Sequence, residues 1–377
     1  MLLFLKKIFY NQLRDTVRDD RKRVLIVRLD VIGDFILWID AAKELRCLFP
    51  QRDYSITLVG NSIWTSLAKN LDYFDEVWPL DRQALIKSSF KFVRFVRKLS
   101  SVCFDTVLHP VYSREFLFGD FFVWACTAQA KIGMEGDNLN ESRWQKRLGD
   151  RFYTRLILCP NNTQTELERN AVFMRAIGLS DFRAGTSALA LPSETHLILP
   201  YTDYYVVVPG ASVAARRWPV ANFASLIEKT QAMSGLPAVV CGGPTEKALG
   251  ETLEETTSSP VLNLVGKTSL SELVSIIAGA RFLIGNETGA VHIAAAVRTP
   301  SVCILGGGHF GRFIPYCPGT ADVRRLLSPV FRKMVCFGCN WQCIYKTPFD
   351  EAVPCIRNIS VDEVLAAVLE SFKLKEA

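Results

Sequence analysis

The feature that most constrains this chain is a repeated alternation of short apolar runs with longer, helix-like segments. "VLIV" at residues 24–27 is a continuous apolar run, as expected for a parallel strand that is covered on both faces. The turn "LDVIGD" follows, and then "FILWIDAAKELRCLF" carries apolar residues at helical spacing up to Pro50. Later come "YSITLVG", "EVWPL" and "FDTVLHP" as strands, with "FVRFVRKL" as a helix. The alternation predicts a parallel α/β sheet.

The same plan restarts after an interruption. "SALALPSETHLILPYTDYYV" breaks the rhythm with prolines and polar residues, and "YYVVVPG", "PAVVCGG", "RFLIGN" and "SVCILGG" then continue as strands between helical segments. A length of 377 residues also favours two domains, at about 100–200 residues per domain. Because open α/β sheets bind ligands at the carboxyl ends of their strands, we expect the loops after strands to carry the chemistry.

The domain boundaries follow from this pattern. We expect an amphipathic extension, an N-terminal α/β domain, a linker, a C-terminal α/β domain and a final helix, over residues 1–22, 23–185, 186–203, 204–357 and 358–377 respectively. The final helix has Ser360 at its start and a glutamate at the capping-box position.

Composition narrows the class of protein only slightly. The net charge of +6 suits an anionic ligand or a membrane surface as well as a nucleic acid. No run of about 18 apolar residues lacks charges, so no transmembrane helix is expected. The first stretch, "MLLFLKKIFYNQL", mixes apolar and basic residues; it suits either a membrane interface or a helix packed on its own protein. Seven scattered cysteines suit reduced core thiols in a cytosol, namely Cys47, Cys103, Cys126, Cys159, Cys241, Cys303 and Cys317.

The loop "VRLDVIGDF" places Gly33 and Asp34 at the start of a helix. Gly33 allows an unusual backbone angle or the close approach of a ligand. Asp34 has two interpretations: it caps the helix, where aspartate is favoured, or its carboxylate acts as a general base.

Two more loops combine small residues with a strand end. In "VVVPGASVAARRWPVANF", Gly210 and Ser212 would let backbone N–H groups reach a phosphate, and Arg216 and Arg217 add charges that bind phosphate bidentately. The alternative is a solvated basic turn. In "VVCGGPTEKALG", a tight turn is as good an interpretation of Gly242 and Gly243 as a ligand contact.

The fourth loop, "IGNETGAVHIAAAV", places polar residues where a strand becomes a helix. Free N–H groups at the helix start, near Thr288 and Gly289, attract an anion. Glu287 would repel a phosphate, so we expect it to face hydroxyl groups such as those of a sugar. His292 is either a core residue or a ligand group.

Two motifs are missing. "GxGxxG" does not follow the first strand, as it would in a dinucleotide-binding domain. The chain also lacks an Asp-x-Asp pair to hold a divalent metal on a nucleotide diphosphate. If a diphosphate binds, arginines and helix N-termini must therefore neutralise it.

Together the loops resemble glycosyltransferase family 9, the family of ADP-heptose:lipopolysaccharide heptosyltransferases. The resemblance rests on "RVLIVRLDVIGDFILWIDAAKELRCLFP", "VVVPGASVAARRWPVANFASLI", "VGKTSLSELVSIIAGARFLIGNETGAVHIAAAV" and "PSVCILGG", which occur in the family's order. It implies a GT-B fold, in which two Rossmann-like domains face each other across a cleft. It also implies an N-terminal acceptor domain, a C-terminal nucleotide-sugar domain and an inverting, metal-independent reaction.

The family's motifs imply roles for particular residues. Its Gly-Asp falls on Gly33 and Asp34, which makes Asp34 the base for the acceptor hydroxyl. Its Lys-x-Trp-Pro falls on Arg216 to Pro219, with arginine where lysine is usual. Its Asp-Thr-Gly-x-x-His falls on Glu287 to His292, with glutamate where aspartate is usual. The implied donor and phosphate site is Gly210, Ser212, Arg216, Arg217, Thr288, Gly289 and His292, with Glu287 on the sugar and Gly33, Gly242, Gly243 and Lys267 in support.

A cysteine-rich segment follows the second domain. "CFGCNWQCIYKTPFDEAVPC" spaces four thiols as C-x2-C-x3-C-x11-C, at Cys336, Cys339, Cys343 and Cys355. Four thiolates could hold a structural zinc ion or ligate an iron–sulfur cluster; reduced thiols in a loop are the alternative. No cofactor is expected in catalysis itself.

These observations favour a transferase that moves a sugar, by resemblance heptose from ADP-heptose, to a lipopolysaccharide core or related glycan. A nucleotide-sugar epimerase and a non-catalytic nucleotide-sugar-binding protein stay open. The expected partners are the donor and a lipid-linked acceptor, with inner-membrane contact through the basic N-terminal stretch and no nucleic acid. The expected location is the cytoplasm, including the inner face of the inner membrane.

Overall fold

The computed structural model describes residues 20–160, 163, 165–186, 188–191, 197–316 and 326–373. Most of the predicted N-terminal extension, part of the predicted linker and Cys317 lie outside these residues. The chain divides into two compact units. The first comprises Met1–Thr163 and Glu168–Ala184, and the second comprises Gln164–Leu167 and Gly185–Ala377.

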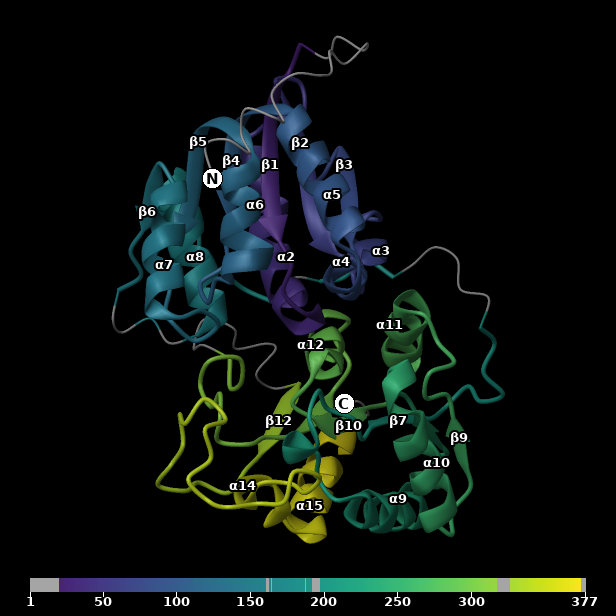
Figure 1. Cartoon of the computed structure of the whole chain (residues 1–377). Coiled ribbons are helices and arrows are strands. Elements are labelled where there is room, and N and C mark those ends of the chain that lie inside the picture. Colours follow the sequence, from purple (N-terminus) through teal and green to yellow (C-terminus); the bar gives the residue numbers. More distant parts are fainter. Residues whose placement is uncertain are drawn as a thin grey trace. The chain divides into compact units, whose positions relative to one another are not determined.

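The first unit is built on a parallel sheet of six strands in the order β3-β2-β1-β4-β5-β6 (Figure 1). The strands are β1 Lys22–Arg28, β2 Tyr54–Asn61, β3 Glu76–Leu80, β4 Cys103–His109, β5 Thr127–Met134 and β6 Arg155–Ile157. The helices are α2 Ile32–Leu48, α3 Thr65–Ala68, α4 Arg82–Lys87, α5 Ser89–Ser101, the π-helix η1 Phe116–Asp120, α6 Phe121–Ala125, α7 Arg143–Gly149, the 3-10 helix η2 Asp150–Phe152 and α8 Glu166–Ile177.

Alternating side chains of the sheet make the core of this unit. On one face, Leu25, Val27 and Val107 pack with Val96 of α5 and Phe122 of α6. Since neighbouring residues of a strand point to opposite faces, the equally buried Val24 and Ile26 line the other face. The apolar run in β1 is continuous because both faces of the sheet are covered.

The second unit repeats this architecture with the sheet order β12-β11-β10-β7-β8-β9, again with parallel strands. The strands are β7 Tyr205–Val208, β8 Ala238–Val240, β9 Val261–Asn263, β10 Leu283–Asn286, β11 Ser301–Ile304 and β12 Leu327–Val330. The helices are η3 Ala214–Arg216, α9 Val220–Ser234, η4 Pro244–Glu246, α10 Lys247–Thr256, α11 Leu270–Gly279, α12 Gly289–Ala296, α14 Pro354–Arg357 and α15 Val361–Lys373.

The core of the second unit includes the C-terminal helix. Phe223 of α9, Leu253 of α10 and Val364 of α15 are buried in one cluster with the sheet residues Val207 and Ile284. At the start of α15, Ser360 and Glu363 form the predicted capping box: Glu363 accepts from the Ser360 backbone at 2.7 Å, and the Ser360 hydroxyl accepts from the Glu363 backbone at 3.3 Å.

Both sheets have the strand order of a Rossmann fold, 3-2-1-4-5-6, when strands are numbered within each unit. The chain therefore leaves the first strand of each sheet in one direction and later returns to its other side. This reversal lies between β1 and β4 in the first unit and between β7 and β10 in the second. Ligands of such sheets bind at the carboxyl ends of these two strands. The predicted parallel α/β class is confirmed.

The scattered cysteines and the expected absence of a transmembrane helix can also be compared with the structure. Cys126, Cys241 and Cys303 are buried as predicted, but Cys47 and Cys103 are exposed, so the prediction of core thiols is wrong for those two. Both lie at the ends of elements, where the chain reaches solvent. Within the described residues, no helix is long and apolar enough to cross a membrane.

Candidate functional site

A buried asparagine holds together the two strand ends of the second unit where a ligand is expected. Asn286, the last residue of β10, is fully buried. Its side-chain amide donates to the carbonyls of Pro209 at 2.7 Å and Gly210 at 3.3 Å, and its carbonyl accepts from the Trp218 backbone at 3.1 Å. The turn after β7 is thus fixed to β10. The sequence analysis gave Asn286 no role, although a polar residue at the end of a buried strand was the available signal.

Glu287 follows directly and is paired with Arg216. The glutamate is 7% exposed, and its Oε2 lies 3.5 Å from Nη2 of Arg216. The same guanidinium donates to the Glu287 backbone carbonyl at 3.4 Å. Burial raises the pKa of Glu287 to about 7, against the opposing effect of Arg216. Within the described residues neither carboxylate oxygen has a hydrogen-bond partner, so the carboxyl group has unused capacity for hydroxyl donors.

The start of α12 is the segment for which the sequence predicts anion binding. Thr288 occupies the N-cap position but makes no capping hydrogen bond with its side chain. Its buried hydroxyl also has no partner among the residues that the structure describes. The first N–H groups of a helix lack intrahelical acceptors, so those near Gly289 can face an anion. Thr288 and Gly289 directly follow Glu287, whose carboxylate and backbone carbonyl both contact Arg216.

His292 is buried in the same helix. Its Nδ1 lies 2.8 Å from the hydroxyl of Tyr316, and its ring packs against Phe313. Burial lowers the pKa of His292 to about 4, so the ring is neutral at pH 7 and supplies no positive charge. Of its two predicted interpretations, the structure shows the contacts of a satisfied core residue.

The remaining residues of the turn after β7 hold its shape. Arg217 donates through Nε and Nη2 to the carbonyl of Ala211, at 3.1 and 3.0 Å, which leaves its guanidinium engaged within the turn. The exposed Ser212 accepts from Nη1 of Arg216 at 3.4 Å. Arg216, rather than Arg217, is therefore the cation directed toward Glu287.

The glycines of this edge surround the side chain of Glu246. A Cβ on Gly210 would lie 1.9 Å from Oε1 of Glu246, and one on Gly242 would lie 2.8 Å from Oε2. The backbone N–H of Gly243 donates to that same carboxylate at 2.7 Å. Gly210 and Gly242 therefore leave room for the Glu246 side chain as it lies here, whereas a Cβ on Gly243 would meet it only at 3.8 Å. Lys267 is exposed and donates to the carbonyl of Asn263 on β9, two strands away from β7.

The cysteine-rich segment contacts this site through Trp341. The Arg216 guanidinium lies 4.6 Å from the centre of the Trp341 ring, a cation–π contact. Backbone N–H groups of Gly338 and Asn340 donate to the carbonyls of Gly307 and Gly308, at 2.8 and 2.9 Å. The segment is thereby joined to the turn after β11. The sequence analysis missed Trp341 because nothing in its local pattern points to a residue so distant in sequence.

The four clustered cysteines come together. Cys336, Cys339, Cys343 and Cys355 line one small cavity, and Sγ of Cys355 accepts from the Gly307 backbone at 3.4 Å. Burial raises the pKa of Cys355, and its three neighbouring thiols raise it further. The described residues contain no preformed group of three or more His, Cys, Asp or Glu side chains in a metal-binding arrangement.

In the first unit, Asp34 lies in the first turn of α2. The N-cap residue is Val31 and makes no side-chain cap bond, so the interpretation of Asp34 as the cap is wrong. The helix begins at Ile32, three residues earlier than that interpretation requires. Gly33 is buried in the same turn, whereas Asp34 is half-buried. Asp34 therefore sits at the positive end of the helix dipole, at the carboxyl end of β1.

A second residue missed by the sequence analysis is Arg28, at the end of β1. Its side chain is fully buried, with Nε 2.9 Å from Asp30 and Nη1 donating to the carbonyl of Pro110 at 2.8 Å. Nη2 donates to the backbone carbonyl of Asp34 at 3.2 Å. Arg28 thus joins the ends of β1 and β4 in the first unit, as Asn286 joins those of β7 and β10 in the second. A charge at the end of an apolar strand was its only signal.

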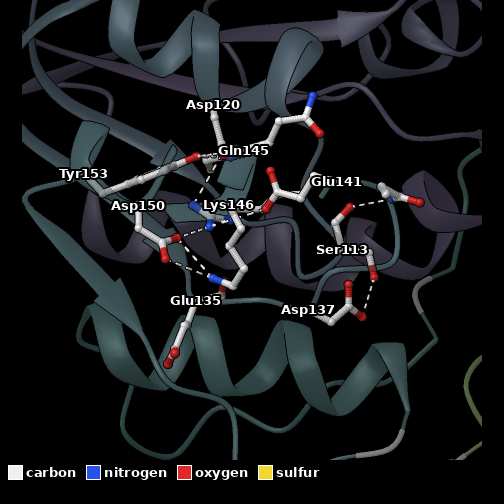
Figure 2. Close-up of polar contacts among 12 residues, drawn as sticks. Ser113, Asp120, Glu135, Asp137, Glu141, Gln145, Lys146, Asp150 and Tyr153 are labelled. Atoms are coloured by element: carbon white, nitrogen blue, oxygen red, sulfur yellow. Dashed lines mark hydrogen bonds and ion pairs between the residues drawn. The ribbon is translucent and has the colours of Figure 1, made fainter. Parts of the chain in front are cut away.

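A larger polar cluster lies beyond β4 and β5 (Figure 2). The Tyr153 hydroxyl donates to Asp120 at 2.6 Å, and Nζ of Lys146 donates to Asp150 at 3.1 Å. The fully buried Arg114 pairs with Asp120 at 3.4 Å and with Glu141 at 3.8 Å, and also contacts Asp150. The cluster fixes the loops after β4 and β5 to α7.

The electrostatics of this cluster are unusual for carboxyl groups. Burial, reinforced by the nearby Asp120, raises the pKa of Glu141 to about 7. Neither Glu141 oxygen has a hydrogen-bond partner among the described residues. Burial also lowers the pKa of the adjacent His109 to about 3, so that ring stays neutral. Near neutral pH, Glu141 rather than His109 therefore changes its protonation state.

Comparison with known proteins identifies this architecture. The structure of Escherichia coli ADP-heptose LPS heptosyltransferase II superposes with a TM-score of 0.68 at 16% identity, over 94% of this chain and 100% of that one. The fold is therefore that of the GT-B glycosyltransferases. Residues 92–334 match the model of glycosyltransferase family 9 (heptosyltransferase), and the chain belongs to this family.

Curated relatives agree with the assignment. Lipopolysaccharide heptosyltransferase 3 of Escherichia coli K12 is 29% identical over 187 residues, which cover 47% of this chain and 53% of that protein. Lipopolysaccharide heptosyltransferase 1 of Salmonella typhimurium is 23% identical over 295 residues, covering 75% and 88% respectively. The chain thus spans about half the length of the first of these relatives.

Proposed function

We propose that this protein is an inverting glycosyltransferase that moves heptose from ADP-heptose to a lipopolysaccharide core or related glycan, without a catalytic metal. Family membership supports the reaction class. The observation that carries the proposal is the pairing of buried Glu287 with Arg216 beside the start of α12, at the topological reversal of the second sheet. This arrangement offers a cation and helix N–H groups to a diphosphate, and a carboxyl group to sugar hydroxyls.

Each donor group has a defined task in this proposal. Arg216 neutralises the charge that grows on the leaving diphosphate, with help from the N–H groups at the start of α12. Glu287 accepts hydrogen bonds from the sugar, and Thr288 donates one with its free hydroxyl. Glu287 must be ionised to form an ion pair with Arg216. Because its pKa is about 7, this ionisation occurs close to neutral pH.

The chemical step is a single displacement. The acceptor oxygen forms a bond to the anomeric carbon while the bond from that carbon to the diphosphate breaks. Asp34 receives the proton of the acceptor hydroxyl, and ADP leaves with the bonding electron pair. Arg28 serves this step indirectly because it holds the backbone at Asp34.

We propose in addition that the four clustered cysteines bind a structural metal such as zinc. All four line one cavity, and although the described residues hold no preformed ligand group, thiols that close around an ion would make the tetrahedral site that four thiolates favour. Because this segment carries Trp341 against Arg216, the metal would support the donor site without taking part in the reaction. Metal analysis of the purified protein tests this: about one equivalent is expected, and it should be lost in Cys343→Ser.

The acceptor and the location belong to the same proposal. A lipid-linked glycan acceptor of the lipopolysaccharide pathway places the enzyme in the cytoplasm, on the inner face of the inner membrane. The heptosyltransferases among its relatives support this assignment. The proposed function involves no nucleic acid.

The decisive experiment follows thermal unfolding with ADP, UDP and GDP, with and without EDTA, and then tests transfer. A ligand that binds only the folded state must raise the melting temperature. We expect a shift that is selective for ADP, is unaffected by EDTA and is lost in Arg216→Ala. Asp34→Asn should keep the ADP shift but lose transfer from ADP-heptose to heptose-free lipopolysaccharide.

Other outcomes would favour other functions. Release of ADP from ADP-heptose without any acceptor, at the same rate in Asp34→Asn, would favour an epimerase. Binding of ADP without turnover of either kind would indicate a binding protein. If ADP still raised the melting temperature of Arg216→Ala, the assignment of Arg216 to the donor site would be wrong.

A further inference from the structure

The outer face of α5 carries exposed apolar residues that its core packing does not explain. The inner face buries Val96 and Leu99 against the first sheet. On the outer face, Phe90 is 75% exposed and Val93 is 38% exposed. Ile86 of the adjacent α4 is 62% exposed. Exposed aromatic and aliphatic side chains at neighbouring positions are typical of an interaction surface.

Basic residues surround these apolar side chains. Residues 82–101 contain six Lys or Arg and no Asp or Glu, as many positive charges as the net +6 of the whole chain. Arg82 pairs with Glu115, and Lys98 lies 3.6 Å from the centre of the Trp78 ring. Lys87, Lys91 and Arg94 are exposed beside Ile86, Phe90 and Val93. These six residues are named the basic–apolar strip.

The chemistry of the strip discriminates among partners. A second copy of the same strip would bring like charges together, which disfavours a symmetric contact. A nucleic-acid duplex would satisfy the cations but leave the aliphatic Ile86 and Val93 without an apolar surface. An anionic lipid surface satisfies both features, because phosphate headgroups lie directly above an apolar layer.

We propose that the basic–apolar strip of α4 and α5 docks the first unit onto a membrane that contains anionic lipids. Lys87, Lys91 and Arg94 bind headgroup phosphates, and Phe90 enters the boundary between headgroups and acyl chains. Docking makes no use of Arg216, Glu287 or Asp34, so the inference stands independently of the proposed reaction. The strip is a different segment from the basic N-terminal stretch.

Co-sedimentation of the full-length chain with vesicles tests the proposal. We expect binding to phosphatidylcholine vesicles with 30% phosphatidylglycerol, and little binding to phosphatidylcholine alone. Each basic residue near an anionic membrane contributes about a fivefold factor to partitioning, so Lys91→Glu with Arg94→Glu should lower it at least about 25-fold. Phe90→Ser should lower it about tenfold.

Matched variants separate the strip from general charge and hydrophobicity. Lys43→Glu with Lys69→Glu makes the same change in net charge at exposed positions of α2 and the end of α3. Phe349→Ser removes a phenylalanine that is 97% exposed in the second unit. Both controls should bind like the wild type, and all variants should keep the wild-type thermal response to ADP.

The proposal is overturned if the strip variants bind anionic vesicles as well as the wild type does, or if the charge control falls equally. In the first case another segment of the chain holds the membrane, and in the second only net charge matters. Loss of the ADP response in every protein, with strip-dependent vesicle binding retained, would instead contradict the proposed reaction and leave the docking surface intact.

Discussion

At the scale of single residues, both units place a carboxyl group with a raised pKa near the carboxyl edge of the sheet. Glu287 lies beside Arg216 in the second unit, and Glu141 lies beside Arg114 in the first. In each case burial outweighs the neighbouring cation and raises the pKa to about 7. The difference is that Glu141 shares its surroundings with a second buried acid, Asp120.

Glu141 therefore makes the stability of the protein depend on pH. Its folded pKa lies above its unfolded value of 4.5, so its protonated form favours the folded state. That contribution is complete below pH 4.5 and is lost as the pH rises through 7. We expect Glu141→Gln to match the wild type at pH 5 and to exceed it by about 1–2 kcal/mol at pH 8, after discounting for solvent screening.

Urea unfolding at the two pH values measures this difference. Glu251→Gln, at an exposed position of α10, is the control and should follow the wild type at both. If Glu141→Gln retained the full pH dependence of the wild type, the proton would have to reside on another group of the cluster.

At the scale of elements, the sequence predicts the central strands far better than the edges. β1, β7 and β10 each contain a continuous apolar run because both faces of the sheet are covered where they lie. β5 is half-exposed over much of its length, and β6 has three residues, so neither carries a clear pattern. No strand or helix was predicted between residues 110 and 185. The buried polar cluster around Arg114 lies in this part of the chain, and the sequence did not predict it.

The candidate site also has residues that the sequence predicts and residues that it does not. The loops that hold Asp34, Arg216 and Glu287 are local junctions of strand and helix, which leave a signature in the sequence. The contacts of Asn286 and Trp341 join segments that are distant in the chain. They depend on tertiary structure, and no local pattern encodes them.

The contact between the cysteine-rich segment and η3 predicts a role for Trp341 in donor binding. Trp341→Ala removes the ring beside the Arg216 guanidinium, a contact of about 1–2 kcal/mol when partly desolvated. We expect KM for the nucleotide sugar to rise about fivefold to thirtyfold, with a smaller change in kcat. Trp341→Phe keeps an aromatic face and should restore most of the loss.

Steady-state kinetics with varied donor concentration test this prediction. Circular dichroism serves as the folding control. An equal fall in kcat for the Ala and Phe variants, with KM unchanged, would mean that Trp341 acts on the stability of the segment and not on Arg216.

At the scale of the whole molecule, the chain contains the same strand order twice, and each copy has its own core. The first core centres on residues such as Phe122, and the second on residues such as Phe223. Since each sheet is covered on both faces within its own unit, we expect two unfolding transitions in calorimetry. ADP should raise only the transition of the second unit.

Core substitutions assign the two transitions. Phe122→Leu should shift one transition to lower temperature and Phe223→Leu the other. Each substitution should lower the free energy of unfolding of its own unit by about 1–1.5 kcal/mol. A single transition that both substitutions lower, and that ADP raises as a whole, would show that the units unfold together.

The stacking of Trp341 on Arg216 also gives the protein an optical reporter. The emission of an indole ring depends on the charge beside it, and the guanidinium next to this ring is the group proposed to neutralise the diphosphate. Donor binding should therefore change the intrinsic fluorescence, and Trp341→Phe should abolish that change while the other six tryptophans supply the background emission. Occupancy of the donor site could then be followed in real time without a labelled sugar.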